Sequence, residues 1–294
     1  MMSAASDRRH FGPETSGHRP TLQEVGETEA SGAVGAIYRD IAEIGGYATV
    51  PLLYRRLAVR AGCLEWAWRF LRQGYASGEI PRSGDRFTVD VGAVIPLSTA
   101  VMNAQGVSKE QRQIAKEVVK AFNLANPMNL LAAHLIDAAA HSGVGPHWDA
   151  SETRRAAIPV RPSNSRLPKP VPPEEMLPKD RQLLEWLSSS GGCSPAVLVP
   201  TLYLILARMP ALLTLIACRL DPVFADGSIA RKASELEASA ARSCKEFSGV
   251  REIENECPAP EFVSEIVAPF RSKVAEMLVV GTLIGTFVSG SVDD

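Results

Sequence analysis

A gap-free internal alignment constrains this chain more than any other feature of its sequence. The segment VPLLYRRLA at 50–58 aligns with VPTLYLILA at 199–207, and the match continues at the same spacing to Gly78 and Gly227. Chance supplies a few leucine pairs, but it rarely supplies proline, tyrosine and glycine in one register. Two copies at so long a spacing do not make a solenoid. We therefore expect two related halves that pack about an approximate two-fold axis.

Most of the chain outside its turns follows a helical pattern of apolar residues, which predicts an all-α fold. Ser108 followed by Gln111 is the capping-box pattern that opens a helix. Asn126 followed by Pro127 resembles an N-cap with proline in the first turn, so we expect the helix to break and restart there. The expected helices cover 21–44, 51–76, 108 to the Asn-Pro pair and 128–141, and helical patterns resume near Asp180, Ser194, Asp226 and Pro260.

A proline-rich segment divides the chain. Residues 161–173 read RPSNSRLPKPVPP, and proline this dense favours extended backbone over helix. A chain of 294 residues is also longer than one hydrophobic core usually serves. We predict a disordered N-terminus at 1–20, a first helical repeat at 21–148, a Pro-rich linker at 149–177 and a second helical repeat at 178–294.

Composition and charge argue against several classes of partner. The net charge is -2 and aromatic residues make up 6%, so we expect no nucleic-acid partner. The five cysteines are scattered and form no CxxC pair, which favours a reducing cytoplasm. The apolar stretch 196–218 is long enough to cross a bilayer, but its counterpart at 50–71 carries several arginines. Equivalent helices should share an environment, so we expect a core helix and no membrane.

In both copies of the repeat, a proline occupies the first turn of the expected helix, where its missing N–H costs nothing. The residues around 49–53 and 200–203 would then offer free backbone N–H groups. If the two-fold axis passes close by, both helix starts face one cavity, which would favour a small carboxylate or a similar anion.

Three polar residues share one face of an expected helix. His134, Asp137 and His141 are spaced i, i+3 and i+7, which would allow metal ligation. Two turns separate the histidines, however, and helical zinc motifs use an i, i+4 pair. We interpret these residues as polar groups on a solvated face, and we expect no metal and no cofactor.

Four segments together resemble the group I 2-haloacid dehalogenases: YRDI at 38–41, the block at 50–58, LEWAW at 64–68 and AFNLANP at 121–127. The similarity covers most of 21–230. It implies an all-α fold of two pseudo-symmetric repeats with the site between them, and a homodimer. It also implies hydrolysis of carbon–halogen bonds in both enantiomers of 2-haloalkanoic acids, by direct attack of water and without a cofactor.

The resemblance assigns roles to six positions of this chain. Asn126 matches the asparagine that orients the attacking water. The family's Ser-Asp pair, which contains the general base, corresponds to Thr201 and Leu202. Leucine accepts no proton, and loss of a general base typically costs ~100- to 10,000-fold in rate. The remaining substrate-binding positions that the resemblance implies are Thr49, Leu52 and Met128.

Three functions therefore remain open. The chain could be a carbon–halide hydrolase with an altered site, in which another carboxylate such as Glu65, Asp221 or Asp226 replaces the base. It could be a non-enzymatic protein that binds small carboxylates or hydrophobic acids in the cavity between the repeats. It could also be a helical interaction or membrane-associated protein, which only the apolar segments favour. The residue at position 202 favours the binding protein.

Overall fold

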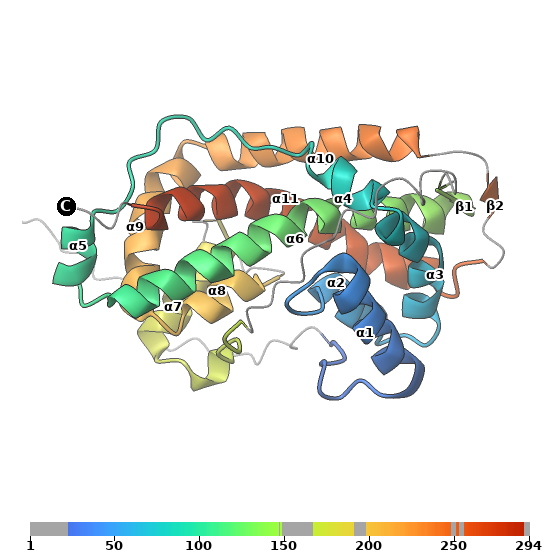
Figure 1. Ribbon diagram of the computed structural model, residues 1–294, viewed down its shortest axis with the longest axis horizontal. Coiled ribbons are helices and arrows are strands. Elements are labelled where there is room, and N and C mark those ends of the chain that lie inside the picture. The colour runs from blue at the N-terminus through green and yellow to red at the C-terminus, as the bar shows by residue number, and fades with distance from the viewer. Residues whose placement is uncertain are drawn as a thin grey trace, which may run out of the picture.

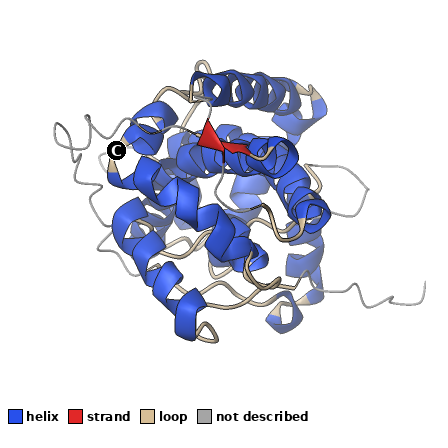
Figure 2. Cartoon of the chain, turned by 90° about the vertical axis from the view of Figure 1, so that its right-hand side faces the viewer, coloured by secondary structure: helices blue, strands red, loops and turns tan. Residues whose placement is uncertain are grey.

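A computed structural model describes residues 23–146, 148, 167–190, 198–247, 251–252 and 256–290. This part of the chain is built almost entirely of helices, which confirms the all-α prediction (Figure 1). Viewed along the long axis, the short strands lie among the helices (Figure 2). The strands are β1 (Val144–Gly145) and β2 (Arg251–Glu252), paired antiparallel.

Each half of the chain contributes several short helices and ends in a long one. The first half contains α1 (Gly32–Gly45), α2 (Leu52–Leu57), α3 (Cys63–Ala76), α4 (Glu79–Gly84), α5 (Thr99–Ala104) and α6 (Lys109–Ser142). The second half contains the 3-10 turn η2 (Pro173–Glu175), α7 (Pro178–Ser188), α8 (Thr201–Leu206), α9 (Pro210–Ala225), α10 (Ser228–Glu246) and α11 (Pro260–Val288).

Helix ends recur at the positions that the internal alignment pairs. Helices α2 and α8 begin after Pro51 and Pro200 and have the same length of 6 residues. Gly78 and Gly227 precede α4 and α10 with φ of 76° and 71°, a left-handed conformation that glycine adopts without a Cβ penalty. The paired prolines and glycines of the alignment therefore mark equivalent helix starts.

The long helices α6 and α11 form the centre of the molecule, and their contact is the most extensive between any two elements (Figure 1). Helix α6 also contacts α8, and α11 contacts α2. Each long helix therefore reaches the short helix of the other half. The buried faces of these elements join one continuous hydrophobic core.

Two expected helices differ from the observed ones. The helix expected at 21–44 begins only at Gly32, after a turn that starts near Gly26. The helix expected at 51–76 is two helices, α2 and α3, separated by a bend that includes Gly62 at φ 84°. The apolar period continues through the bend, so the pattern concealed it. Residues 87–98, for which the sequence predicts no helix, are mostly extended chain, and α5 follows them.

The predicted break at Asn126 is wrong, because α6 runs without interruption through Pro127. Proline removes one backbone hydrogen bond inside a helix. Packing on both sides holds the helix together: Pro127 lies against Gly84, and Asn123 Nδ2 donates to the Gly281 carbonyl of α11 at 3.0 Å. The capping box of Ser108 and Gln111 at the start of α6 is confirmed.

Parts of the predicted domain organisation lie outside the described residues, namely the N-terminus at 1–20 and the linker residues 149–166. The described end of the linker follows the second half closely, with the Val171 N–H donating to the Leu204 carbonyl at 3.0 Å. The long apolar stretch at 196–218 contains the two helices α8 and α9 with a turn between them. No helix among the described residues has the length and apolar character needed to cross a membrane.

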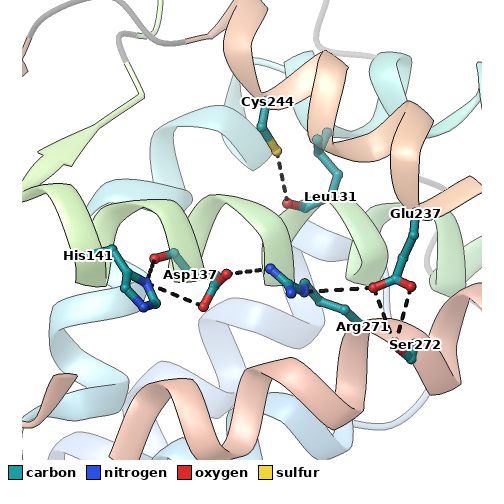
Figure 3. Close-up of polar contacts among 7 residues, drawn as sticks. All are labelled: Leu131, Asp137, His141, Glu237, Cys244, Arg271 and Ser272. Carbon is teal, nitrogen blue, oxygen red and sulfur yellow. Dashed lines mark hydrogen bonds and ion pairs between the residues drawn. The ribbon is translucent and has the colours of Figure 1, made fainter. Parts of the chain in front are cut away.

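The interpretation of His134, Asp137 and His141 as a solvated face is wrong for two of the three. His134 is buried. Asp137 accepts a hydrogen bond from Nη1 of Arg271, which belongs to α11, and the Arg271 Nε lies 3.9 Å from Oε1 of Glu237 in α10 (Figure 3). Only His141 is exposed; its Nδ1 lies 2.8 Å from the Asp137 carbonyl oxygen. These contacts join the long helices of the two halves.

Candidate functional site

A cavity of ≈ 90 Å³ lies where the two halves meet. It holds several water-sized molecules, since one water needs roughly 10–15 Å³ on this measure. The segments that precede α2 and α8 both line it, and α6 and α11 complete its wall. In Figure 1 these two short helices lie on the same side of α6. The described lining residues are Tyr47–Leu52, Arg55, Ala121, Phe122, Ala125, Asn126, Asn129, Leu167, Leu198–Leu202, Phe270, Lys273, Val274 and Met277.

Four positions named from the resemblance lie in this lining at the two helix starts. Leu202 is 1% exposed and contributes an aliphatic wall, with Thr201 beside it. Leu52, which the internal alignment pairs with Thr201, lines the cavity in the first half. Thr49 is engaged elsewhere, because its hydroxyl donates to the Glu27 carboxylate at 2.5 Å. Glu27 also accepts the Val50 N–H at 3.0 Å, so this backbone donor is not free for a ligand.

Asn126 lies in the middle of α6 and lines the cavity. Its side chain is only 6% exposed and makes no hydrogen bond to any described residue. Its amide atoms are not among the polar atoms that are sealed inside the described part of the protein without a partner. An amide in this position is available to a bound molecule or to water, and it plays no part in capping a helix.

Met128 is not in the cavity. Its side chain is buried and contacts the position of Gly84, where an added Cβ would lie 3.4 Å from the Met128 Cγ. Because α6 is continuous, residue 128 faces about 200° away from Asn126 on the helix. The resemblance implied that position 128 contributes to the site, but Met128 is not among the described residues that line the cavity.

Two cations line the cavity, and neither was singled out from the sequence. Arg55 Nη1 donates to Glu24 at 2.6 Å, and its Nε is buried without a partner. The guanidinium has five N–H donors, and because Nε is sealed inside the protein, only the Nη groups can meet a ligand. Lys273 Nζ is 2.8 Å from both the Ser188 carbonyl and Glu276 Oε2, so it acts mainly through its charge.

A second amide, Asn129, lies one turn beyond Asn126 and is 5% exposed. Its Oδ1 accepts a hydrogen bond of 3.0 Å from the hydroxyl of Tyr47, which also lines the cavity. Burial raises the pKa of Tyr47 well above 10, so its hydroxyl stays neutral. The spacing of Asn126 and Asn129 along α6 was the only sequence signal for this residue, and a helix break would have obscured it.

The described lining contains no carboxylate. Glu24 and Glu276 pair with the two cations from outside the lining, and Glu27 accepts hydrogen bonds from Thr49 and Val50. None of the three carboxylates is hydrogen-bonded to Asn126. Glu65 is in the first turn of α3, and neither it nor Asp221 nor Asp226 lines the cavity. The site can therefore attract an anion and donate hydrogen bonds, but this lining offers no group to take a proton from water.

No cluster suited to a metal ion is present among the described residues, where no three His, Cys, Asp or Glu side chains converge. The described lining of the cavity also contains no carboxylate, imidazole or thiolate side chain, and its two cations would repel a metal ion.

Neither a family model nor a curated protein matches this chain. Solved structures do. A D-2-haloacid dehalogenase in complex with L-LA has a TM-score of 0.74 and 16% sequence identity, covering 92% of this chain and 97% of that one. A mutant D-2-haloacid dehalogenase with D-2-CPA has a TM-score of 0.73 at the same identity and coverage. A further dehalogenase mutant reaches 0.75 and covers 95% of this chain. The chain therefore has a haloacid dehalogenase-like fold.

Proposed function

We propose that this protein binds a small carboxylic acid in the cavity between its halves, and that it hydrolyses carbon–halogen bonds weakly or not at all. The observation that carries the proposal is the pairing of two features in one small cavity: an amide at Asn126 with no hydrogen-bond partner among the described residues, and an aliphatic Leu202 with no carboxylate in the described lining.

The charges of the cavity favour an acid over a neutral ligand. Arg55 and Lys273 line it, and their counterions Glu24 and Glu276 lie outside the lining. Arg55 retains N–H donors, which form stronger hydrogen bonds to a carboxylate than to a neutral oxygen. The remaining wall is largely aliphatic and aromatic, which suits a short apolar chain on the acid.

Hydrolysis of a 2-haloacid by direct attack makes a further demand. Water must lose a proton as its oxygen attacks the carbon that bears the halogen, and the proton needs an acceptor. Asn126 can hold and orient a water, but an amide is not a base at neutral pH. Leu202 and Thr201 offer no substitute. The proposal is therefore a binding site on a dehalogenase-like frame.

Calorimetric titration with propionate tests the binding, and propionamide of nearly the same shape serves as the neutral control. We expect saturable binding of propionate and binding of propionamide at least ~10-fold weaker, because the amide lacks the charge that the cations attract. Asn126→Ala should weaken propionate binding, while Gln113→Ala, on the exposed side of α6, should leave it unchanged. Equal affinity for acid and amide would contradict the proposal.

A carbon–halide hydrolase is the second candidate, and the likeness to D-2-haloacid dehalogenase structures favours it. Chloride release from D- and L-2-chloropropionate distinguishes the two. We expect little release by the unsubstituted chain and a gain on Leu202→Asp, with Leu202→Asn as a control of the same shape that cannot accept the proton. Rapid release by the unsubstituted chain would establish the hydrolase instead.

A further inference from the structure

Three buried tyrosines connect the interior of the first half to the cavity. Tyr54 and Tyr75 hydroxyl oxygens are 3.0 Å apart, Tyr75 and Tyr47 are 2.9 Å apart, and Tyr47 contacts Asn129 Oδ1 at 3.0 Å. Tyr54 comes from α2, Tyr75 from α3 and Tyr47 from the segment before α2. This chain of hydrogen bonds ends at Asn129 on α6. Only its last two members, Tyr47 and Asn129, line the cavity.

Counting protons fixes the direction of this chain. Each hydroxyl has one proton to donate. If Asn129 donated to Tyr47, the protons would all point the other way, and the Tyr54 proton would be left without an acceptor among the described residues in a fully buried position. An unpaired buried donor is costly. The favoured order is therefore donation from Tyr54 to Tyr75, from Tyr75 to Tyr47, and from Tyr47 to Asn129 Oδ1.

This order determines what Asn129 offers to the cavity. Its oxygen is occupied by Tyr47, so the amide cannot turn over without breaking the chain of hydrogen bonds. Its Nδ2 has no partner among the described residues, and it is not among the nitrogens sealed inside the protein. The residue lines the cavity, so the free NH₂ group faces that space. Asn126, three residues earlier, lies on the same face of α6.

We propose that Asn129 is a second ligand-binding residue, held with its NH₂ group toward the cavity by the Tyr54–Tyr75–Tyr47 hydroxyl chain, and that it selects a carboxylate by donating to it. The inference rests on the proposed binding of a small acid. In this arrangement Asn126 and Asn129 face one ligand from neighbouring turns of the same helix. Tyr47 also lines the cavity, but its hydroxyl proton is directed to Asn129 Oδ1, so its hydroxyl acts as a positioning group for that amide.

The test is propionate and propionamide affinity in four proteins. Asn129→Asp keeps the shape and the oxygen that accepts from Tyr47, but it replaces the NH₂ donor with a second oxygen. We expect it to weaken propionate binding by ~10-fold or more at pH 8 and to bind propionamide better relative to propionate. The new carboxylate also repels propionate by its charge, so the Tyr→Phe variants below, which add no charge, decide whether Asn129 donates to the ligand.

Tyr47→Phe removes the donor that holds Asn129, and Tyr54→Phe is the matched control at the far end of the chain. Without the Tyr54 hydroxyl, Tyr75 still donates to Tyr47, so the order at Asn129 survives. We expect Tyr47→Phe to weaken propionate binding by roughly 3- to 10-fold and Tyr54→Phe to leave it within about twofold. Tyr47→Phe and Tyr54→Phe together still test the role of Asn129 if the Asn129→Asp protein does not fold.

The outcomes separate this inference from the proposed function. Suppose that the unsubstituted protein binds propionate. The role of Asn129 is then refuted, and acid binding stands, if Asn129→Asp binds propionate and propionamide with the affinities of the unsubstituted protein. Equal propionate affinities of Tyr47→Phe and Tyr54→Phe would refute the role in the same way. If the unsubstituted protein binds no propionate, acid binding fails and the role of Asn129 fails with it.

Discussion

Gly281 permits the close crossing of α6 and α11, the two helices that carry the cavity's amides and its lysine. A Cβ added there would lie 2.2 Å from Asn123 Oδ1, well inside van der Waals contact. In Gly281→Ala the Asn123 side chain must move, losing its 3.0 Å hydrogen bond to the Gly281 carbonyl. That bond contributes about 1 kcal/mol. Forcing extra volume into a packed crossing adds about 1–3 kcal/mol, and better helix propensity recovers about 1 kcal/mol.

Gly281→Ala should therefore lower the free energy of unfolding by about 1–3 kcal/mol. Gly285→Ala, one turn further along α11, is the matched control, because its Cβ would meet its nearest neighbours at an ordinary 3.5 Å. It should be neutral or stabilising by up to about 1 kcal/mol. Urea denaturation of both variants, followed by far-UV circular dichroism, measures the difference. Equal midpoints for the two variants would refute this account of the helix crossing.

Three further predictions concern stability. Burial lowers the pKa of His134 from 6.5 to about 4, so protonation favours the unfolded chain. Stability should fall by roughly 3 kcal/mol as the pH drops from 6.5 to 4, and His134→Leu should remove this part of the urea-midpoint pH profile. Gly74→Ala would place a Cβ 2.5 Å from the Trp148 ring, so it should lower the melting temperature and alter tryptophan fluorescence. Ser108→Ala removes the α6 cap and should cost about 1 kcal/mol in urea denaturation.

The fold could be predicted to a large extent because its strongest signals are local. The prolines at 51 and 200 and the paired glycines marked helix starts, since each favours one backbone conformation wherever it occurs. The helix break predicted at Pro127 was wrong because there the packing with distant segments outweighs the local preference of the residue. Its intrinsic cost predicts a break, and only the packing of α6 against α4 and α11 shows that the helix survives it.

The site was harder to predict because the contacts that define it are distant in sequence. Leu52, Thr201 and Leu202 lie in the two segments that the internal alignment pairs, and Thr49 directly precedes the first of them, so the alignment pointed to this region. The hydrogen bond between Tyr47 and Asn129 spans 82 residues. A tyrosine at 47 and an asparagine at 129 do not by themselves predict a binding site. The proposed role of Asn129 depends on the direction of the hydrogen bonds among three tyrosine hydroxyls, which no sequence pattern predicts.

Similar reasoning applies to the cations. Arg55 belongs to the duplicated block, but its partner position in the second half is Leu204, so the alignment gave no reason to favour it. Lys273 lies in α11, beyond the segments that resemble a known family. Charged residues are common on helices, and only the shape of the cavity distinguishes these two from others on the surface.

A crystal structure of the protein soaked with 2-chloropropionate would test the central claim most directly. We predict an intact chlorinated acid in the cavity, with its carboxylate toward Arg55 and the amides of α6 and its carbon chain toward Leu202. A 2-hydroxypropionate in the same density would show that the chain supplies a base after all. A cavity that stays free of the acid at saturating concentration would contradict the binding of small carboxylates altogether.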